Sequence, residues 1–189
     1  MDAVTTSRRE VVPSSVLAVM LVVASEIMFF AGLISAFTIS RAGAPAGTWQ
    51  VPNEPLLPAA STLFNTAALI ASGLVVFVAQ RQYQRRAVGA HRTLFVGFVL
   101  GTAFVVLQGR EWWGLLAQGL TMFSSRLGSF FYLIVGAHAL HAICALVALG
   151  LSWWRMRRGT LTPGFFLGTQ TFWYFVVAVW PIIYGRVYF

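Results

Sequence analysis

Four titratable side chains lie in otherwise apolar stretches of this sequence: Glu26, Glu111, His138 and His141. Glu26 is the only charged residue between positions 13 and 40, a stretch longer than the roughly 20 apolar residues that cross a bilayer. A charged side chain at the centre of a membrane helix costs about 2.5–3.5 kcal/mol of insertion free energy. We therefore expect these side chains to be buried against protein, paired or protonated, and to be the candidates for function.

The spacing along the chain predicts which side chains meet. Glu26 lies 13 residues after Pro13, and His141 lies 13 residues before Trp154 on a helix that runs in the opposite direction. At a rise of about 1.5 Å per residue, both side chains lie roughly 20 Å from the same membrane face. The same count places Tyr174 near this level, so it joins the candidate polar core.

A second pair is predicted from the next polar positions. His138 shares a helix face with His141 because the two are three residues apart, and Glu111 is expected at a similar outer level. We therefore predict two cross-helix pairs, Glu26 with His141 and Glu111 with His138. In each pair the imidazole would offset the cost of burying the carboxylate.

These residue types leave two interpretations open: a proton relay through Glu26 and His141, or hydrogen bonds that only tie helices together. A carboxylate-bridged metal site needs more ligands than this depth offers, and two histidines on one helix face cannot ligate a haem from opposite sides. Ser72 lacks the turn that surrounds a nucleophilic serine. We expect no catalytic residue and no metal ligand in this chain.

The elements that position these residues are membrane helices. Of the 189 residues, 58% are hydrophobic and 10% are charged, and the mean hydropathy is +0.77, whereas a soluble domain carries about 25% charged residues. The sequence predicts one all-α domain over residues 1–189. Its five membrane spans are expected at about 13–40, 58–80, 93–117, 127–153 and 163–188.

The net charge of +8 comes from arginine, since the chain has 13 arginines and no lysine. A cytoplasmic N-terminus places nine arginines inside and four outside, namely Arg41, Arg110, Arg126 and Arg186. By the positive-inside rule, this split predicts an N-terminus in the cytoplasm and a C-terminus outside. Nucleic acid is therefore not needed to explain the charge. The inner arginines are Arg8, Arg9 and Arg92, with six that we expect to bind lipid head groups: Arg81, Arg85, Arg86, Arg155, Arg157 and Arg158.

Several motifs resemble a known membrane family. The segment 25–32, SEIMFFAG, is similar to the SEVMFFAG segment of subunit III of the haem–copper oxidases, especially cytochrome c oxidase. The resemblance continues in order over almost the whole chain, as a proline-rich loop and four helical motifs, at 49–58, 65–73, 108–113, 136–141 and 173–180. It implies the short, five-helix form that is found in bacteria.

The resemblance implies a non-redox accessory subunit of a proton-pumping terminal oxidase in a bacterial plasma membrane. Haem and copper are then expected in the partner subunit I, with subunit II as a further partner. The chain itself would hold phospholipids, stabilise subunit I, support proton uptake and bind no cofactor of its own.

The last helix departs from the family pattern. Tyr174 stands where the family has histidine, and Val177 stands where it has aspartate. A subunit-III-like protein associated with nitric oxide reductases therefore remains an alternative within the family. A small proton-coupled transporter is an alternative of another class, and it would work alone or as a homodimer.

Overall fold

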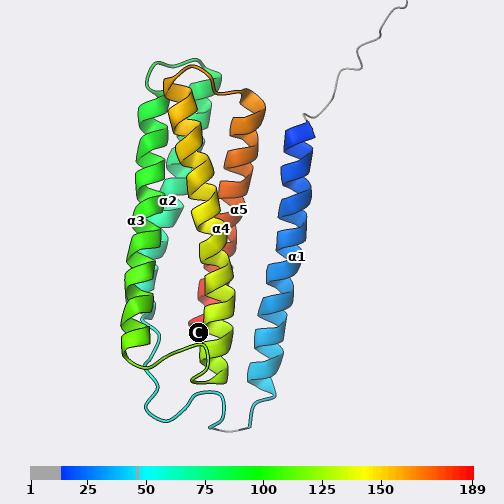
Figure 1. Cartoon of the computed structure of the whole chain (residues 1–189), viewed down its shortest axis with the longest axis vertical. Coiled ribbons are helices and arrows are strands. Elements are labelled where there is room, and N and C mark those ends of the chain that lie inside the picture. The colour runs from blue at the N-terminus through cyan, green and yellow to red at the C-terminus, as the bar shows by residue number, and fades with distance from the viewer. Residues whose placement is uncertain (1–13, 46) are drawn as a thin grey trace, which may run out of the picture.

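The structure is a computed structural model that describes residues 14–45 and 47–189. Within these residues it is a bundle of five membrane-length helices (Figure 1), which confirms the predicted all-α membrane fold. The helices are α1 (Ser14–Ala42), α2 (Ala59–Gln84), α3 (Ala90–Ala117), α4 (Arg126–Arg157) and α5 (Pro163–Val187). The predicted start at Pro13 and the inner pair Arg8 and Arg9 lie outside the described residues.

The helices alternate in direction, so the start of α1 and the end of α5 lie at opposite ends of the bundle (Figure 1). The α2–α3 and α4–α5 connections share the end at which α1 starts, and the other two connections share the end at which α5 finishes. This alternation is what a chain that crosses a bilayer five times requires. It also gathers the six arginines that we expect to bind lipid at one end.

Two helices run past their predicted ends, α2 to Gln84 and α4 to Arg157. The predicted spans ended at residues 80 and 153, shortly before groups of arginines, but an arginine of each group folds back onto an aromatic ring one turn earlier. The guanidinium carbon of Arg81 lies 4.9 Å from the centre of the Phe77 ring, and that of Arg157 lies 5.2 Å from the Trp153 ring. Because arginine can keep its aliphatic stem on an apolar surface, the helix continues past the end of its apolar segment.

Helices α2 to α5 form the centre of the bundle, and α1 stands at its edge beside α5 (Figure 1). Trp173 and Trp180 of α5 are fully buried. In contrast, the buried side chains described for α1 are those of Phe30 and Phe37. Few apolar contacts thus attach α1 to the bundle. A polar contact between α1 and its neighbours is therefore expected to contribute a large share of the free energy that holds α1 in place.

Close packing at the centre depends on glycines of α3. A Cβ atom at Gly101 would lie 2.7 Å from the Trp173 ring, and one at Gly97 would lie 2.8 Å from the Val76 side chain. Both distances are shorter than real Cβ contacts. Small residues at membrane depth therefore allow the helices to approach closely here, as they do in other membrane bundles.

The connection between α1 and α2 folds over the end of the bundle. Trp49 packs against Phe37 and Phe130, with ring centres 5.3 and 6.1 Å apart. The Trp49 carbonyl accepts a hydrogen bond from the Leu127 N–H at 3.3 Å. These contacts fix the end of α1 and the start of α4 relative to each other.

Candidate functional site

Glu26 and His141 meet across the boundary between α1 and α4. The Oε2 atom of Glu26 lies 3.0 Å from the Nε2 atom of His141, and the two side chains are 26% and 16% exposed. The predicted pairing of these two residues is therefore confirmed. Among the described residues this is also the only side-chain hydrogen bond or ion pair between α1 and another helix, because Ser25 and Thr38 bond within α1 itself.

The second ring nitrogen of His141 limits where protons can be. Its Nδ1 atom lies 2.6 Å from the Ala137 carbonyl oxygen. A carbonyl only accepts hydrogen bonds, so Nδ1 carries a hydrogen. The contact with Glu26 then holds one shared proton, either on an imidazolium beside a carboxylate or on a carboxylic acid beside a neutral imidazole. The pair is neutral in both forms and can pass a proton between its members.

Aromatic side chains surround this pair. The His141 ring centre lies 5.4 Å from that of Phe30, 6.2 Å from that of Phe172 and 6.3 Å from that of Phe175. These apolar rings keep the local dielectric low, which strengthens a hydrogen bond that involves a charged group. The site therefore suits both interpretations made from the sequence, a proton-holding pair and a tie between helices.

The predicted pair of Glu111 with His138 is wrong. Glu111 accepts hydrogen bonds from the Thr62 hydroxyl at 2.7 Å, from Asn65 Nδ2 at 2.9 Å and from Gln108 Nε2 at 3.2 Å. Helical rise gives the depth of a residue but not the direction in which it points around the helix. Glu111 points toward α2, where neutral donors satisfy its carboxylate.

This carboxylate cradle at the ends of α2 and α3 was missed, although its donors were visible in the sequence as polar residues at membrane depth. The cradle extends to Tyr188, whose hydroxyl lies 3.1 Å from Gln108 Nε2. Burial raises the pKa of the Tyr188 phenol well above its ordinary value, so the phenol stays protonated. The cradle links α2 and α3 to the C-terminal segment.

His138 lies instead in an aromatic environment and is 2% exposed. Its ring is tilted by 32° against that of Trp180, with the centres 4.9 Å apart, and Phe30 and Phe104 lie further out at 6.3 and 6.5 Å. The indole N–H of Trp180 donates to the Thr66 hydroxyl at 2.8 Å. Within the part of the chain that the structure describes, His138 Nε2 has no hydrogen-bond partner.

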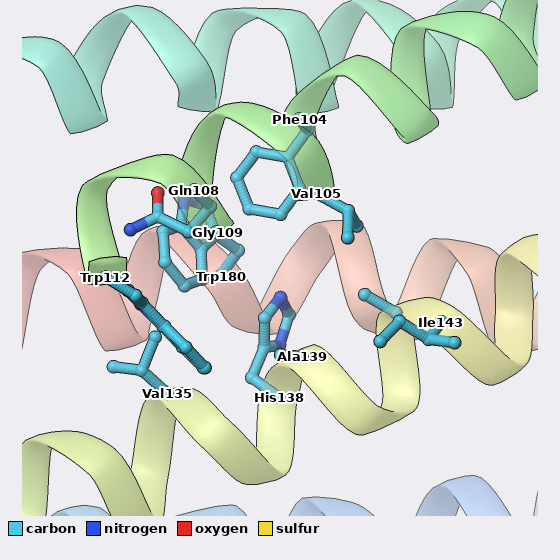
Figure 2. A pocket seen from close by; sticks show the side chains of 11 residues that line it. Phe104, Val105, Gln108, Gly109, Trp112, Val135, His138, Ala139, Ile143 and Trp180 are labelled. Atoms are coloured by element: carbon cyan, nitrogen blue, oxygen red, sulfur yellow. The ribbon is translucent and has the colours of Figure 1, made fainter. Parts of the chain in front are cut away.

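His138 also lines a cavity of about 140 Å³ between α3 and α4 (Figure 2). The figure shows His138 rising from α4 toward Phe104 of α3, with Trp112 to one side and Ile143 to the other. The indole nitrogen of Trp112 is likewise buried without a partner in the described structure. The sequence analysis did not anticipate this cavity.

Tyr174 does not join the Glu26 pair. It lines a groove of about 510 Å³ between α1 and α5, together with Phe30. Its hydroxyl is buried and, among the described residues, makes no hydrogen bond. The depth estimated for Tyr174 therefore does not bring it into the polar core, and we regard it as a wall of this groove.

The six arginines expected to bind lipid lie at or just beyond the ends of α2 and α4. The Arg158 guanidinium lies 4.1 Å from the centre of the Trp154 ring, and that of Arg155 lies 4.4 Å from that of Phe165. Over residues 14–45 and 47–189, no carboxylate forms an ion pair with an arginine. Their charges therefore remain available to anions.

Comparison with known proteins agrees with this architecture. The family model described as cytochrome c oxidase subunit III matches residues 6–189. A probable cytochrome c oxidase subunit 3 of Nocardia farcinica is 33% identical over 172 residues, which cover 87% of this chain and 82% of the relative.

Similar relatives occur in other bacteria and in animals. The cytochrome c oxidase subunit 3 of Corynebacterium diphtheriae is 32% identical, with the same coverage of both chains. That of Lemur catta is 31% identical and is matched over 89% of this chain and 63% of its own length. The chain belongs to the cytochrome c oxidase subunit III family.

Proposed function

We propose that this chain is a non-redox accessory subunit of a proton-pumping haem–copper terminal oxidase in a bacterial plasma membrane. It contacts the subunit I that holds haem and copper, together with subunit II, and it stabilises subunit I. The single observation that carries this proposal is the family match over residues 6–189. Within the described residues, no group of three His, Cys, Asp or Glu side chains is placed to hold a metal ion.

Support for proton uptake is the role that we assign to Glu26 and His141. The contact between the two side chains lies in an aromatic surrounding and can share one proton, and the Ala137 carbonyl fixes the orientation of the imidazole. A carboxylate and an imidazole within hydrogen-bond distance are the groups from which membrane proton relays are built. The other three polar residues have separate structural roles: Glu111 joins α3 to α2, Tyr174 forms a wall of the groove between α1 and α5, and His138 packs against Trp180.

Lipid binding is the second part of the proposal. The arginines at the ends of α2 and α4 suit the phosphates of anionic lipids. Two grooves with apolar walls lie beside α1, and apolar walls suit acyl chains. One is the groove of about 510 Å³ that Tyr174 lines, and the other, of about 370 Å³, lies where the start of α1 meets α5 and Ala148 of α4. With these arginines in the cytoplasm, the N-terminus is inside and the C-terminus is outside.

Depletion of this chain from the purified oxidase tests the proposal. We expect the remaining subunits to keep their haem spectrum, but to lose activity progressively during turnover and to pump fewer protons per electron. Adding back the wild-type chain should reverse both effects. A Glu26→Ala chain should slow the loss of activity during turnover but should not restore full proton uptake. Unchanged turnover and pumping after complete depletion would contradict the proposed role.

A further inference from the structure

The cavity between α3 and α4 has features that neither the Glu26 pair nor the proposed accessory role explains (Figure 2). We propose that it binds the head group of a lipid-soluble quinone. The inference goes beyond the proposed function, because the family match assigns no such ligand to this chain and the cavity lies apart from the grooves beside α1.

Three of the residues that line the cavity, Gln108, Trp112 and His138, carry a buried polar atom that has no partner among the described residues. His138 is 98% buried, and its Nε2 atom and the Trp112 Nε1 atom have no partner among the described residues. An unsatisfied buried polar group costs about 1–3 kcal/mol. The indole nitrogen is a donor only, whereas the imidazole nitrogen either donates or accepts according to its tautomer. A ring that carries oxygen atoms offers partners to such groups, a quinone through its carbonyls and a quinol through its hydroxyls.

The remaining walls fit a flat apolar ring. Phe104, Trp180 and Val105 line the cavity, and its surface is otherwise almost entirely apolar. At about 140 Å³, it is close in size to the apolar cavity of about 150 Å³ that admits a benzene ring in another protein. A single quinone ring is therefore accommodated between the aromatic faces.

The cavity opens at the surface of the helix bundle. Ile143 on α4 is 48% exposed, Gly109 on α3 is exposed, and a Cβ atom at Gly109 would meet no other atom within 4 Å. An isoprenoid tail can leave between these two residues into the lipid. A phospholipid head group fits less well, because no arginine lines the cavity to neutralise its phosphate.

The test uses a photoreactive azidoquinone with a decyl tail on the intact, detergent-purified oxidase, with the labelled peptides identified by mass spectrometry. We expect the label in segments 104–112 and 135–143, and we expect excess decylquinone, but not phospholipid, to compete it away. Gly109→Leu fills the cavity and should abolish this labelling. Gly114→Leu is the matched control on α3, since its Cβ also meets no atom within 4 Å but lies outside the cavity, and it should leave labelling unchanged.

Trp112→Phe keeps an aromatic wall but removes the donor, so we expect binding about tenfold weaker, which corresponds to the loss of one hydrogen bond. The proposal is overturned if Gly109→Leu and Gly114→Leu are labelled equally, if the label lies in other segments, or if phospholipid competes as well as decylquinone. Mass identification of the partner subunits keeps this result separate from the proposed function. An intact oxidase without labelling refutes only the quinone site.

Discussion

The contact of Glu26 with His141 gives the sharpest prediction about how α1 is held. A double-mutant cycle with Glu26→Ala, His141→Ala and the double variant isolates the free energy of this contact. A hydrogen bond to a charged group contributes about 1.5–3 kcal/mol in general. Between membrane helices the measured couplings average about 0.6 kcal/mol and reach about 1.7 kcal/mol.

The geometry favours the upper part of the membrane range. The contact is 3.0 Å long, both side chains are mostly buried, and the bond of Nδ1 to Ala137 holds the imidazole in place. We therefore expect a coupling free energy of about 1–1.7 kcal/mol. Glu26→Gln should lower the free energy of unfolding by less than half as much as Glu26→Ala does. The reason is that the carboxamide N–H still donates to the free Nε2 atom of a neutral imidazole.

The assay is an SDS titration in mixed micelles, followed by circular dichroism and tryptophan fluorescence. A parallel cycle of Glu26→Ala with Glu111→Ala is the control. It should be additive within about 0.5 kcal/mol, since Glu111 bonds to Thr62, Asn65 and Gln108 and not to Glu26. Additive effects of Glu26→Ala and His141→Ala would refute the pairing as an energetic tie.

Further predictions concern packing, the carboxylate cradle and the arginines. Gly101→Ala should destabilise the bundle by about 1–3 kcal/mol through overpacking against α5, whereas Gly136→Ala, whose Cβ meets no atom within 4 Å, should stay within about 0.5 kcal/mol. Asn65→Leu removes a donor from the Glu111 carboxylate and should lower the SDS unfolding midpoint, at a cost of about 1–3 kcal/mol. Arg158→Gln should reduce retention of anionic, but not zwitterionic, lipid when lipids that copurify are quantified by mass spectrometry.

Apolar length and depth along the axis were predictable from the sequence. The five apolar stretches predict the five helices because a membrane span needs a minimum number of apolar residues. The Glu26 and His141 positions could be matched because both depths follow from helical rise. Helix ends were less accurate, since arginines that stack on Phe77 and Trp153 extend the helices beyond their apolar segments.

Direction around each helix could not be predicted in the same way. The error at Glu111 arose because a match in depth suggested His138 as its partner, whereas helix packing turns Glu111 toward Asn65. The cavity beside His138 could not be predicted for the same reason, since its volume depends on how α3, α4 and α5 pack together. Residue types identify the polar groups, whereas tertiary packing decides which of them find hydrogen-bond partners.

The most direct test of the account is purification in mild detergent through a tag on this chain, with an optical spectrum and mass identification of its partners. We predict that a large subunit containing haem and copper copurifies with the chain and that the preparation shows the absorption bands of a terminal oxidase. A colourless preparation that contains only copies of this chain would contradict the assignment to an oxidase and would favour the transporter alternative.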